Sequence, residues 1–248
     1  AVWLDIKSGW EAMTPDLSPD ERATQRGLIE GLRLRRLTDG RESLIITDGN
    51  NQPVIMRTAL QDRPHVVSFS DAILPDRPTF LHSHITETTL SIEDIQVLHE
   101  EGGRAITAIS PGGSMWRARR GSETPRRAER EFIARALSEY AEQLRGLDPQ
   151  DARKVYQHAL MLWLEHKGVI TYSFNLSERN RQLFNRHADL IRSLSHDRPL
   201  SDAWKRHLDW LRSEPEGILA RDQAIEAAEF HIFLLEQTPT PQRPAEAA

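Results

Sequence analysis

The segment spanning residues 80–94 constrains the fold of this chain more than any other stretch of its 248 residues. It starts with a short apolar run that ends in His82-Ser83-His84, and a polar loop follows. Residues two apart in a strand point to the same face, so His82 and His84 can direct two imidazoles at one point. The loop ends at Ser91, and Asp94 follows with the spacing of a helix start. The segment therefore predicts a strand, a loop and a helix in close succession.

The Asp94 carboxylate lies one turn into the predicted helix, and a loop that folds back would place it beside both imidazoles. Two imidazoles, one carboxylate and an open fourth position describe a catalytic zinc site. Each part also has a simpler interpretation, since strand histidines often only form hydrogen bonds and Ser91 with Asp94 is a good capping box. The combined pattern favours a metal site, with His82, His84 and Asp94 as zinc ligands and Ser91 beside the open position.

The spacing His82-Ser83-His84, six residues, Ser91, two residues, Asp94 resembles the signature of the JAMM metallopeptidases, also called MPN or JAB domains. Ile85 stands where that signature usually has a proline, and the loop is shorter than in the commonest eukaryotic members. Shorter loops are similar to those of JAB-like domains in phage and bacterial-toxin proteins. The resemblance covers about residues 24–120. It implies an α+β fold, a cytidine-deaminase-like mixed sheet flanked by helices.

The resemblance also implies a chemistry for this site. In the family a glutamate after the first helix activates the zinc-bound water, and Glu42 occupies that place. A glutamate between a helix and a strand is also common at protein surfaces, and Glu30 and Glu87 are the substitutes if Glu42 faces solvent. The Ser91 hydroxyl would stabilise the oxyanion of the substrate. We therefore expect hydrolysis of an amide or isopeptide bond in a protein or peptide substrate. The substrate of family members is often a ubiquitin-like tail, which binds in an extended form beside a strand.

The remaining apolar pattern predicts a mixed sheet followed by a mainly helical region. Strands are expected over residues 43–47, 54–60, 65–69, 80–84, 105–110, 115–118 and 169–174, the last as an added edge strand. Helices are expected over residues 23–37, 92–101, 124–145, 150–166, 177–194, 201–212 and 217–236. The chain divides into an N-terminal arm (1–23) that packs its tryptophans on the core, the JAMM-like domain (24–120), a helical region (121–237) and a Pro-rich, disordered tail (238–248).

The helical region carries six histidines, none of them paired at ligand spacing with another histidine or a carboxylate. We expect them at the surface or at an interface: His158, His166, His187, His196, His207 and His231. The region is expected to bind a partner protein or to form a homo-oligomer.

The composition excludes several classes of protein. The chain lacks cysteine, so it has neither a disulfide scaffold nor a thiolate metal site. Its net charge of -5 makes nucleic acid an unexpected partner. No apolar run approaches the ~20 residues of a membrane span, and the first residues lack the plan of a signal peptide. We therefore expect a cytoplasmic protein.

Two alternatives remain from the sequence. His82-Ser83-His84 before a loop, a helix and the strand 105–110 also resembles the first motif of PHP phosphoesterases, which form a (β/α) barrel. That motif continues into Thr-Asp-His, whereas this chain has Ser110-Pro111-Gly112, so two expected ligands are missing. The other alternative is a catalytically inactive JAMM-like scaffold for protein assembly, and bound zinc would separate it from the enzyme.

Overall fold

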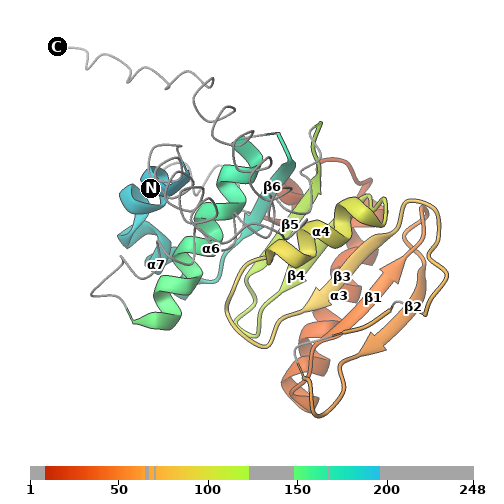
Figure 1. Ribbon diagram of the computed structural model, residues 1–248. Coiled ribbons are helices and arrows are strands. Elements are labelled where there is room, and N and C mark those ends of the chain that lie inside the picture. Colours follow the sequence, from red (N-terminus) through yellow and green to blue (C-terminus); the bar gives the residue numbers. More distant parts are fainter. Residues whose placement is uncertain (1–8, 65–66, 70, 123–147, 167, 196–248) are drawn as a thin grey trace, which may run out of the picture.

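The computed structural model describes residues 9–64, 67–69, 71–122, 148–166 and 168–195 (Figure 1). These residues form an α+β fold in which a six-stranded mixed sheet has the order β2-β1-β3-β4-β5-β6. The strands are β1 (Ser43–Thr47), β2 (Pro53–Thr58), β3 (Thr79–Ser83), β4 (Ala105–Ile109), β5 (Met115–Arg120) and β6 (Ile170–Asn175). The helices are α2 (Trp10–Met13), α3 (Pro19–Asp39), α4 (Ile92–Glu100), α6 (Pro149–His166), α7 (Glu178–Arg186) and α8 (Ala188–Ser195).

The sheet is open and mainly antiparallel, because only β3 and β4 pair in parallel. A parallel pair needs a crossover connection, and α4 supplies it between these two strands. Strands β2 and β6 lie at the two edges of the sheet. The described residues thus have the mixed sheet with helices that the sequence predicts, and their strand order is not that of a (β/α) barrel.

The sheet has a hydrophobic core on each face. Side chains alternate between the two cores along the strands: Phe80 packs in the core that includes α4 and α6, while Leu81 packs in the core that includes α2 and α3. All five residues of β3 are buried as a result. His82 lies two residues after Phe80, so its imidazole points to the α4 side of the sheet.

Helix α3 begins four residues before the predicted start, inside the segment that we assigned to the N-terminal arm. The Ser18 side chain accepts a hydrogen bond from the Glu21 backbone N–H, and the Glu21 carboxylate accepts one from the Ser18 N–H. Pro19 occupies the first helical position, where its missing N–H costs nothing. Gly40 ends the helix in the left-handed conformation. Trp10 of the same arm is buried against the core, as predicted, whereas Trp3 lies outside the described residues.

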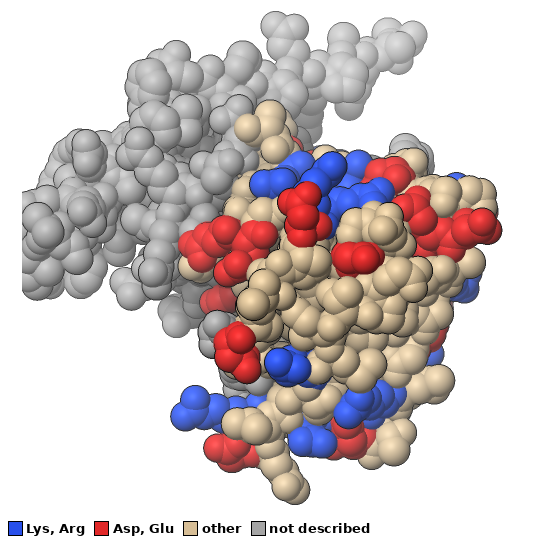
Figure 2. All heavy atoms as spheres, turned by 90° about the vertical axis from the view of Figure 1, so that its right-hand side faces the viewer, with Lys and Arg blue, Asp and Glu red and all other residues tan. Residues whose placement is uncertain are grey.

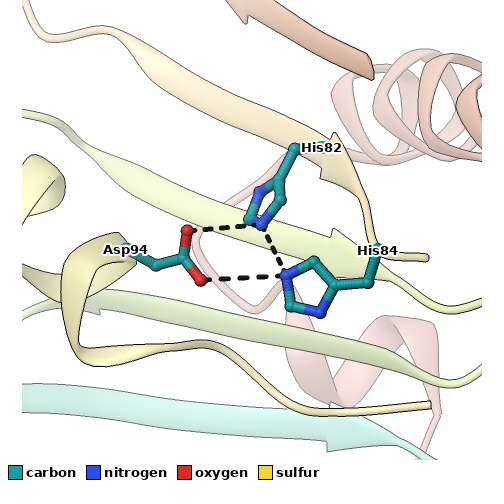
Figure 3. Close-up of side chains that lie close together, drawn as sticks. All are labelled: His82, His84 and Asp94. Atoms are coloured by element: carbon teal, nitrogen blue, oxygen red, sulfur yellow. Dashed lines mark hydrogen bonds and ion pairs between the residues drawn. The ribbon is translucent and has the colours of Figure 1, made fainter. Parts of the chain in front are cut away.

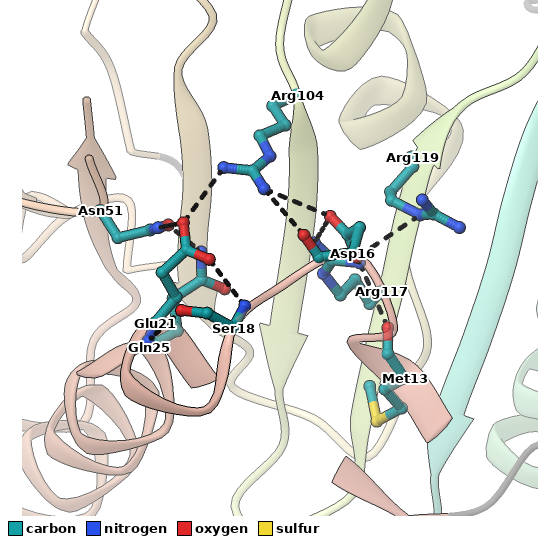
Figure 4. A network of polar contacts seen from close by, with 9 residues as sticks. All are labelled: Met13, Asp16, Ser18, Glu21, Gln25, Asn51, Arg104, Arg117 and Arg119. Carbon is teal, nitrogen blue, oxygen red and sulfur yellow. Dashed lines mark hydrogen bonds and ion pairs between the residues drawn. The ribbon is translucent and has the colours of Figure 1, made fainter. Parts of the chain in front are cut away.

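The arm is held to the sheet by a buried ion pair (Figure 4). Arg117 of β5 is fully buried and donates to both Asp16 carboxylate oxygens at 2.8 and 3.0 Å. The same guanidinium donates to the Met13 carbonyl oxygen at 3.2 Å. Arg104 and Arg119 approach the Asp16 carboxylate at 3.8 Å from the surface side. The short segment after α2 is therefore fixed by charge as well as by apolar packing.

Two further predicted elements differ from the structure. Residues 67–69 are not in a strand, and residues 65–66 of the same expected strand lie outside the described residues. The helix expected over 177–194 is two helices, α7 and α8, which meet at His187. The predictions for residues 124–145, 201–212, 217–236 and 238–248 also lie outside the described residues.

The chain after residue 120 shares the core of the preceding part. Strand β6 pairs with β5 along six residues, so the segment 169–174 is indeed an edge strand. Residues of α6 and β6, including Trp163 and Phe174, belong to the same apolar cluster as Phe80 and Trp116. In the described part of the chain, the sheet and its core therefore continue beyond the domain boundary that the sequence suggests.

His158 is buried, contrary to the surface or interface position that we expected for it, and His196, His207 and His231 lie outside the described residues. The side chain of His158 is fully buried in α6, where the imidazole stacks on the Phe184 ring with centroids 4.3 Å apart. Its Nδ1 lies 3.0 Å from the Tyr172 hydroxyl. The imidazole can be buried because it has an aromatic neighbour and a polar partner. Both are distant in the sequence, so residue spacing does not predict these contacts.

The β2 edge exposes part of its apolar surface. The side chains of Val54 and Met56 are about half exposed, at 50% and 52%. Figure 2 views the molecule from this side, where charged side chains of both signs gather above and below an uncharged area. Within the described residues, no helix combines the length and the apolar character that crossing a membrane requires.

Candidate metal centre

The end of β3 carries both histidines. His82 is the last but one residue of the strand, and His84 lies just beyond it. The His84 N–H donates to the Ile109 carbonyl oxygen at 2.9 Å, which continues the pairing with β4 past the end of the strand. The two side chains therefore keep the strand alternation and point to the same face, as predicted.

The structure brings His82, His84 and Asp94 together (Figure 3). The two Nε2 atoms are 2.8 Å apart. The Asp94 Oδ1 atom lies 3.3 Å from His82 Nε2, and Oδ2 lies 3.8 Å from His84 Nε2. The ligand atoms of all three residues lie within 4.8 Å of one another. The three predicted ligands thus form a cluster that could hold a metal ion.

A backbone carbonyl fixes the orientation of one imidazole. His84 Nδ1 lies 2.9 Å from the Thr88 carbonyl oxygen. A carbonyl oxygen only accepts hydrogen bonds, so Nδ1 carries the proton and Nε2 keeps its lone pair in the neutral ring. A metal-binding histidine commonly has such a partner on its other nitrogen. The site loop therefore presents His84 in the tautomer that a metal ion needs.

The capping box of α4 fixes the carboxylate. The Ser91 N–H donates to Asp94 Oδ2 at 2.7 Å, and the Asp94 N–H donates to Ser91 Oγ at 3.2 Å. Oδ2 thus accepts one hydrogen bond from the backbone, while Oδ1 lies 3.3 Å from His82 Nε2. The helix-start interpretation and the metal-site interpretation of these two residues are therefore compatible, because the cap is what aims the carboxylate.

The donor set could hold a metal ion such as zinc, by the number and chemistry of its ligand atoms. Ligand atoms at 2.0–2.2 Å from a tetrahedral zinc ion are roughly 3.3–3.5 Å apart. The observed separations of 2.8 and 3.3 Å between His82 Nε2 and the other two donors are close to that value. Small side-chain shifts would complete the geometry, and two nitrogens with one carboxylate leave a fourth position open.

Burial and charge perturb the ionisable groups of the cluster. Burial opposes the charged form of Asp94, but the neighbouring imidazoles outweigh it and bring the pKa of Asp94 well below its usual value. Burial also opposes protonation of His84, yet the hydrogen bond and charge of Asp94 raise the pKa of His84. Such shifts are typical of functional sites.

Glu42 and Ser91 line the same cavity as the three ligands. Glu42 directly precedes β1, and its backbone is held by hydrogen bonds with Pro64 and Ala59. Its Oε1 accepts a hydrogen bond from the Ile85 N–H at 3.4 Å. Burial raises the pKa of the Glu42 carboxyl, and the positive charges of the two histidines offset part of that rise. The predicted base is thus a partly buried carboxyl that faces the cluster rather than solvent.

The two substitute bases have other partners. The Glu87 carboxylate accepts hydrogen bonds from the Ser110 hydroxyl at 2.7 Å and from the Gly112 N–H, so it lies against the turn between β4 and β5. Glu30 forms an ion pair with Arg33 on the surface of α3. Glu42 is therefore the predicted base that the structure places at the cluster.

Several residues of the site carry no signal in the sequence. Thr88 acts through its backbone carbonyl, which any residue could supply. Gln157 and Arg153 of α6 line the cavity from more than 50 positions away along the chain. The Thr89 hydroxyl lies 2.7 Å from the Tyr172 hydroxyl of β6. The contribution of α6 and β6 to the site was missed because we divided the chain at residue 120.

Neither the models of known protein families, nor curated proteins, nor solved structures give a match to this chain. The geometry of the site therefore carries the functional argument.

Proposed function

We propose that the protein is a zinc-dependent hydrolase that cleaves an amide or isopeptide bond. In this proposal the described sheet and helices are a divergent JAMM-type domain with the cytidine-deaminase-like arrangement. The observation that carries it is the convergence of His82, His84 and Asp94 in one cavity with Glu42 and Ser91 on its wall. This arrangement combines a metal site that has an open position with a candidate base and an oxyanion donor.

Bound zinc would supply a Lewis acid that polarises the substrate carbonyl and lowers the pKa of water. The Glu42 carboxylate would accept a proton from the attacking water and deliver it to the leaving amine, as a base that becomes an acid. Its raised pKa suits this double role, since the group must hold the proton between the two steps.

The Ser91 hydroxyl would donate a hydrogen bond to the oxyanion that develops on the substrate carbonyl. Its oxygen already accepts from the Asp94 N–H, but a hydroxyl has both a donor and acceptor sites, so its proton is free for this purpose. The cap thus holds Ser91 in place while it acts. We take a protein or peptide as the substrate, with a ubiquitin-like tail as the first candidate.

The direct test loads the purified protein with zinc and measures both metal content and cleavage. Suitable substrates are ubiquitin-like fusions and a fluorogenic isopeptide. We expect one zinc ion per chain, held through removal of free metal, and cleavage that a chelator abolishes. Failure to retain zinc would overturn the proposal. Retained zinc without cleavage of any substrate would favour the inactive scaffold.

A further inference from the structure

The cavity that holds the metal ligands extends over an apolar wall. Its volume is about 730 Å³. Six of the apolar residues that line the cavity form this wall: Leu44, Val67, Phe69, Phe80, Val97 and Ile106. A cavity of this size that combines an apolar wall with polar groups is typical of a small-ligand or side-chain pocket.

The apolar wall adjoins the metal ligands for a geometric reason. Phe80 lies two residues before His82 on the same face of β3, so its ring borders the imidazole. Val97 lies one turn after Asp94 on the same side of α4. Phe69 extends the surface, with its ring centroid 5.7 Å from that of Phe80. The strand alternation of β3 and the helical repeat of α4, which direct the predicted ligands into the cavity, thus also place apolar side chains beside them.

Helix α6 adds two polar side chains to the lining of the cavity, Arg153 and Gln157. Gln157 lines the cavity and is only 9% exposed. Its Oε1 atom is buried and has no hydrogen-bond partner among the described residues. An unpaired buried acceptor is costly, and a ligand that brings an N–H group would relieve that cost.

We propose that this cavity binds a large apolar group of the substrate next to the hydrolysed bond, while Gln157 accepts a hydrogen bond from a substrate N–H. The inference rests on the proposed function and narrows its substrate class to a peptide or amide with an aromatic or large aliphatic side chain beside the hydrolysed bond, in place of a ubiquitin-like tail that ends in glycine. A small or charged group at this position would leave the apolar wall exposed to water, so binding would lack the free energy gained by burying apolar surface.

The test compares two zinc-chelating probes that differ only in one side chain, N-acetyl-phenylalanyl hydroxamate and N-acetyl-glycyl hydroxamate. Binding to the zinc-loaded protein is measured by calorimetry, so turnover is not needed. Burial of the phenyl group predicts at least about tenfold tighter binding of the phenylalanyl compound. Equal affinities would overturn this inference while leaving the zinc site intact. If the zinc-loaded protein binds neither probe, the inference falls together with the proposed function.

Two variants assign the effect to the cavity. Val97→Trp fills the space beside the metal ligands, so it should remove the preference and retain binding of the glycyl compound. Val54→Trp, on the half-exposed β2 edge, is the matched control and should keep the preference. Phe69→Ala shrinks the wall without crowding it, and it should reduce the preference if the tryptophan variant does not fold. If the cavity variants bind the phenylalanyl compound as much more tightly than the glycyl compound as the wild type does, the phenyl group does not bind in this cavity.

Gln157 has its own variant. Gln157→Met keeps the length of the side chain and removes the acceptor, so both probes should lose affinity by about three- to tenfold, since both carry the N–H. Gln157→Glu retains an acceptor oxygen and should retain more of the affinity. Unchanged binding of both probes to Gln157→Met would overturn the role of Gln157.

Discussion

The Thr89 hydroxyl and the Tyr172 hydroxyl lie 2.7 Å apart, which joins the loop between the predicted metal ligands to the edge strand β6. Tyr172 is buried, and His158 Nδ1 lies 3.0 Å from the same hydroxyl. Burial raises the pKa of Tyr172 well above its usual value, so the phenol stays protonated and keeps a proton to donate. The part of the chain after residue 120 therefore helps to hold the site loop.

Tyr172→Phe should loosen this loop. The change leaves the Thr89 hydroxyl and His158 without this partner in a buried region, and it should cost about 1–3 kcal/mol of stability. Zinc affinity should also fall, because Thr88, the neighbour of Thr89 in the loop, orients the His84 imidazole through its carbonyl oxygen. Urea unfolding and competition with a chelator measure the two effects. Tyr156→Phe, on the half-buried side of α6, is the control, and equal effects of both variants would contradict the anchoring role.

His82→Ala and His84→Ala should each abolish stable zinc binding. Each change removes one of three protein ligands, and the remaining two donors cannot retain the ion against a chelator. Metal content after removal of free zinc measures the effect. His99→Ala is the control: this imidazole lies in α4 and bonds to the Val169 carbonyl oxygen at 3.1 Å instead of joining the cluster. Zinc retained by both ligand variants would mean that the ion binds elsewhere.

The sequence predicted the parts of the fold that local pattern determines. The strands β1 and β4 and the helix α4 start or end within a residue or two of the expected positions, because short apolar runs mark the strands and a capping box marks the helix. The ligand cluster was also predictable, since His82 and His84 share a strand face and the cap positions Asp94. Glu42 was placed by resemblance alone, and its position at the cluster remains consistent with the predicted role.

Other features depend on contacts between distant residues. Tyr172 and Gln157 reach the site only because β6 pairs with β5 and α6 packs on the sheet. The spacing of residues in the sequence does not predict either contact. The break at His187 has neither glycine nor proline to mark it. The early start of α3, by contrast, could have been predicted from the sequence. Ser18-Pro19-Asp20-Glu21 has the pattern of a capping box, which we did not use when we placed the helix start at residue 23.

Glu42→Gln should keep zinc and lose turnover. The change preserves the shape of the side chain but removes the basic carboxylate, so turnover should fall by roughly 10²-fold or more. Cleavage of a fluorogenic isopeptide, with zinc content measured in parallel, is the assay. Glu93→Gln changes another carboxylate of the same cavity and should have little effect on turnover. Normal turnover of Glu42→Gln would require a different base.

Ser91→Ala should reduce both stability and rate. Loss of the cap should cost about 1 kcal/mol of stability, and loss of the oxyanion donor about 3 kcal/mol in the transition state. Ser18→Ala removes the same type of cap from α3, far from the cluster, and should reduce stability alone. Melting temperature and turnover are measured for both variants. A rate loss in Ser91→Ala no larger than in Ser18→Ala would mean that Ser91 only caps the helix.

Asp16 gives the fold a dependence on pH. Burial alone would raise the pKa of Asp16, but the hydrogen bonds and charge of Arg117 outweigh it and lower the pKa. A carboxyl whose pKa is lower in the folded state stabilises the protein at pH values above its unfolded pKa. That stabilisation is complete above the ordinary aspartate value of about 3.9, and it is lost as the pH falls through the lower pKa of the folded state.

Asp16→Asn should therefore destabilise the protein most at neutral pH. It leaves the fully buried Arg117 without its counter-charge, which should cost about 3 kcal/mol. Urea unfolding at pH 7 measures this difference, and the difference should shrink as the pH falls below the ordinary carboxyl range. Asp71→Asn breaks an exposed pair with Arg57 and should cost at most about 1 kcal/mol. A difference between wild type and Asp16→Asn that is constant from pH 7 to the acid limit would show that packing, rather than charge, holds the arm.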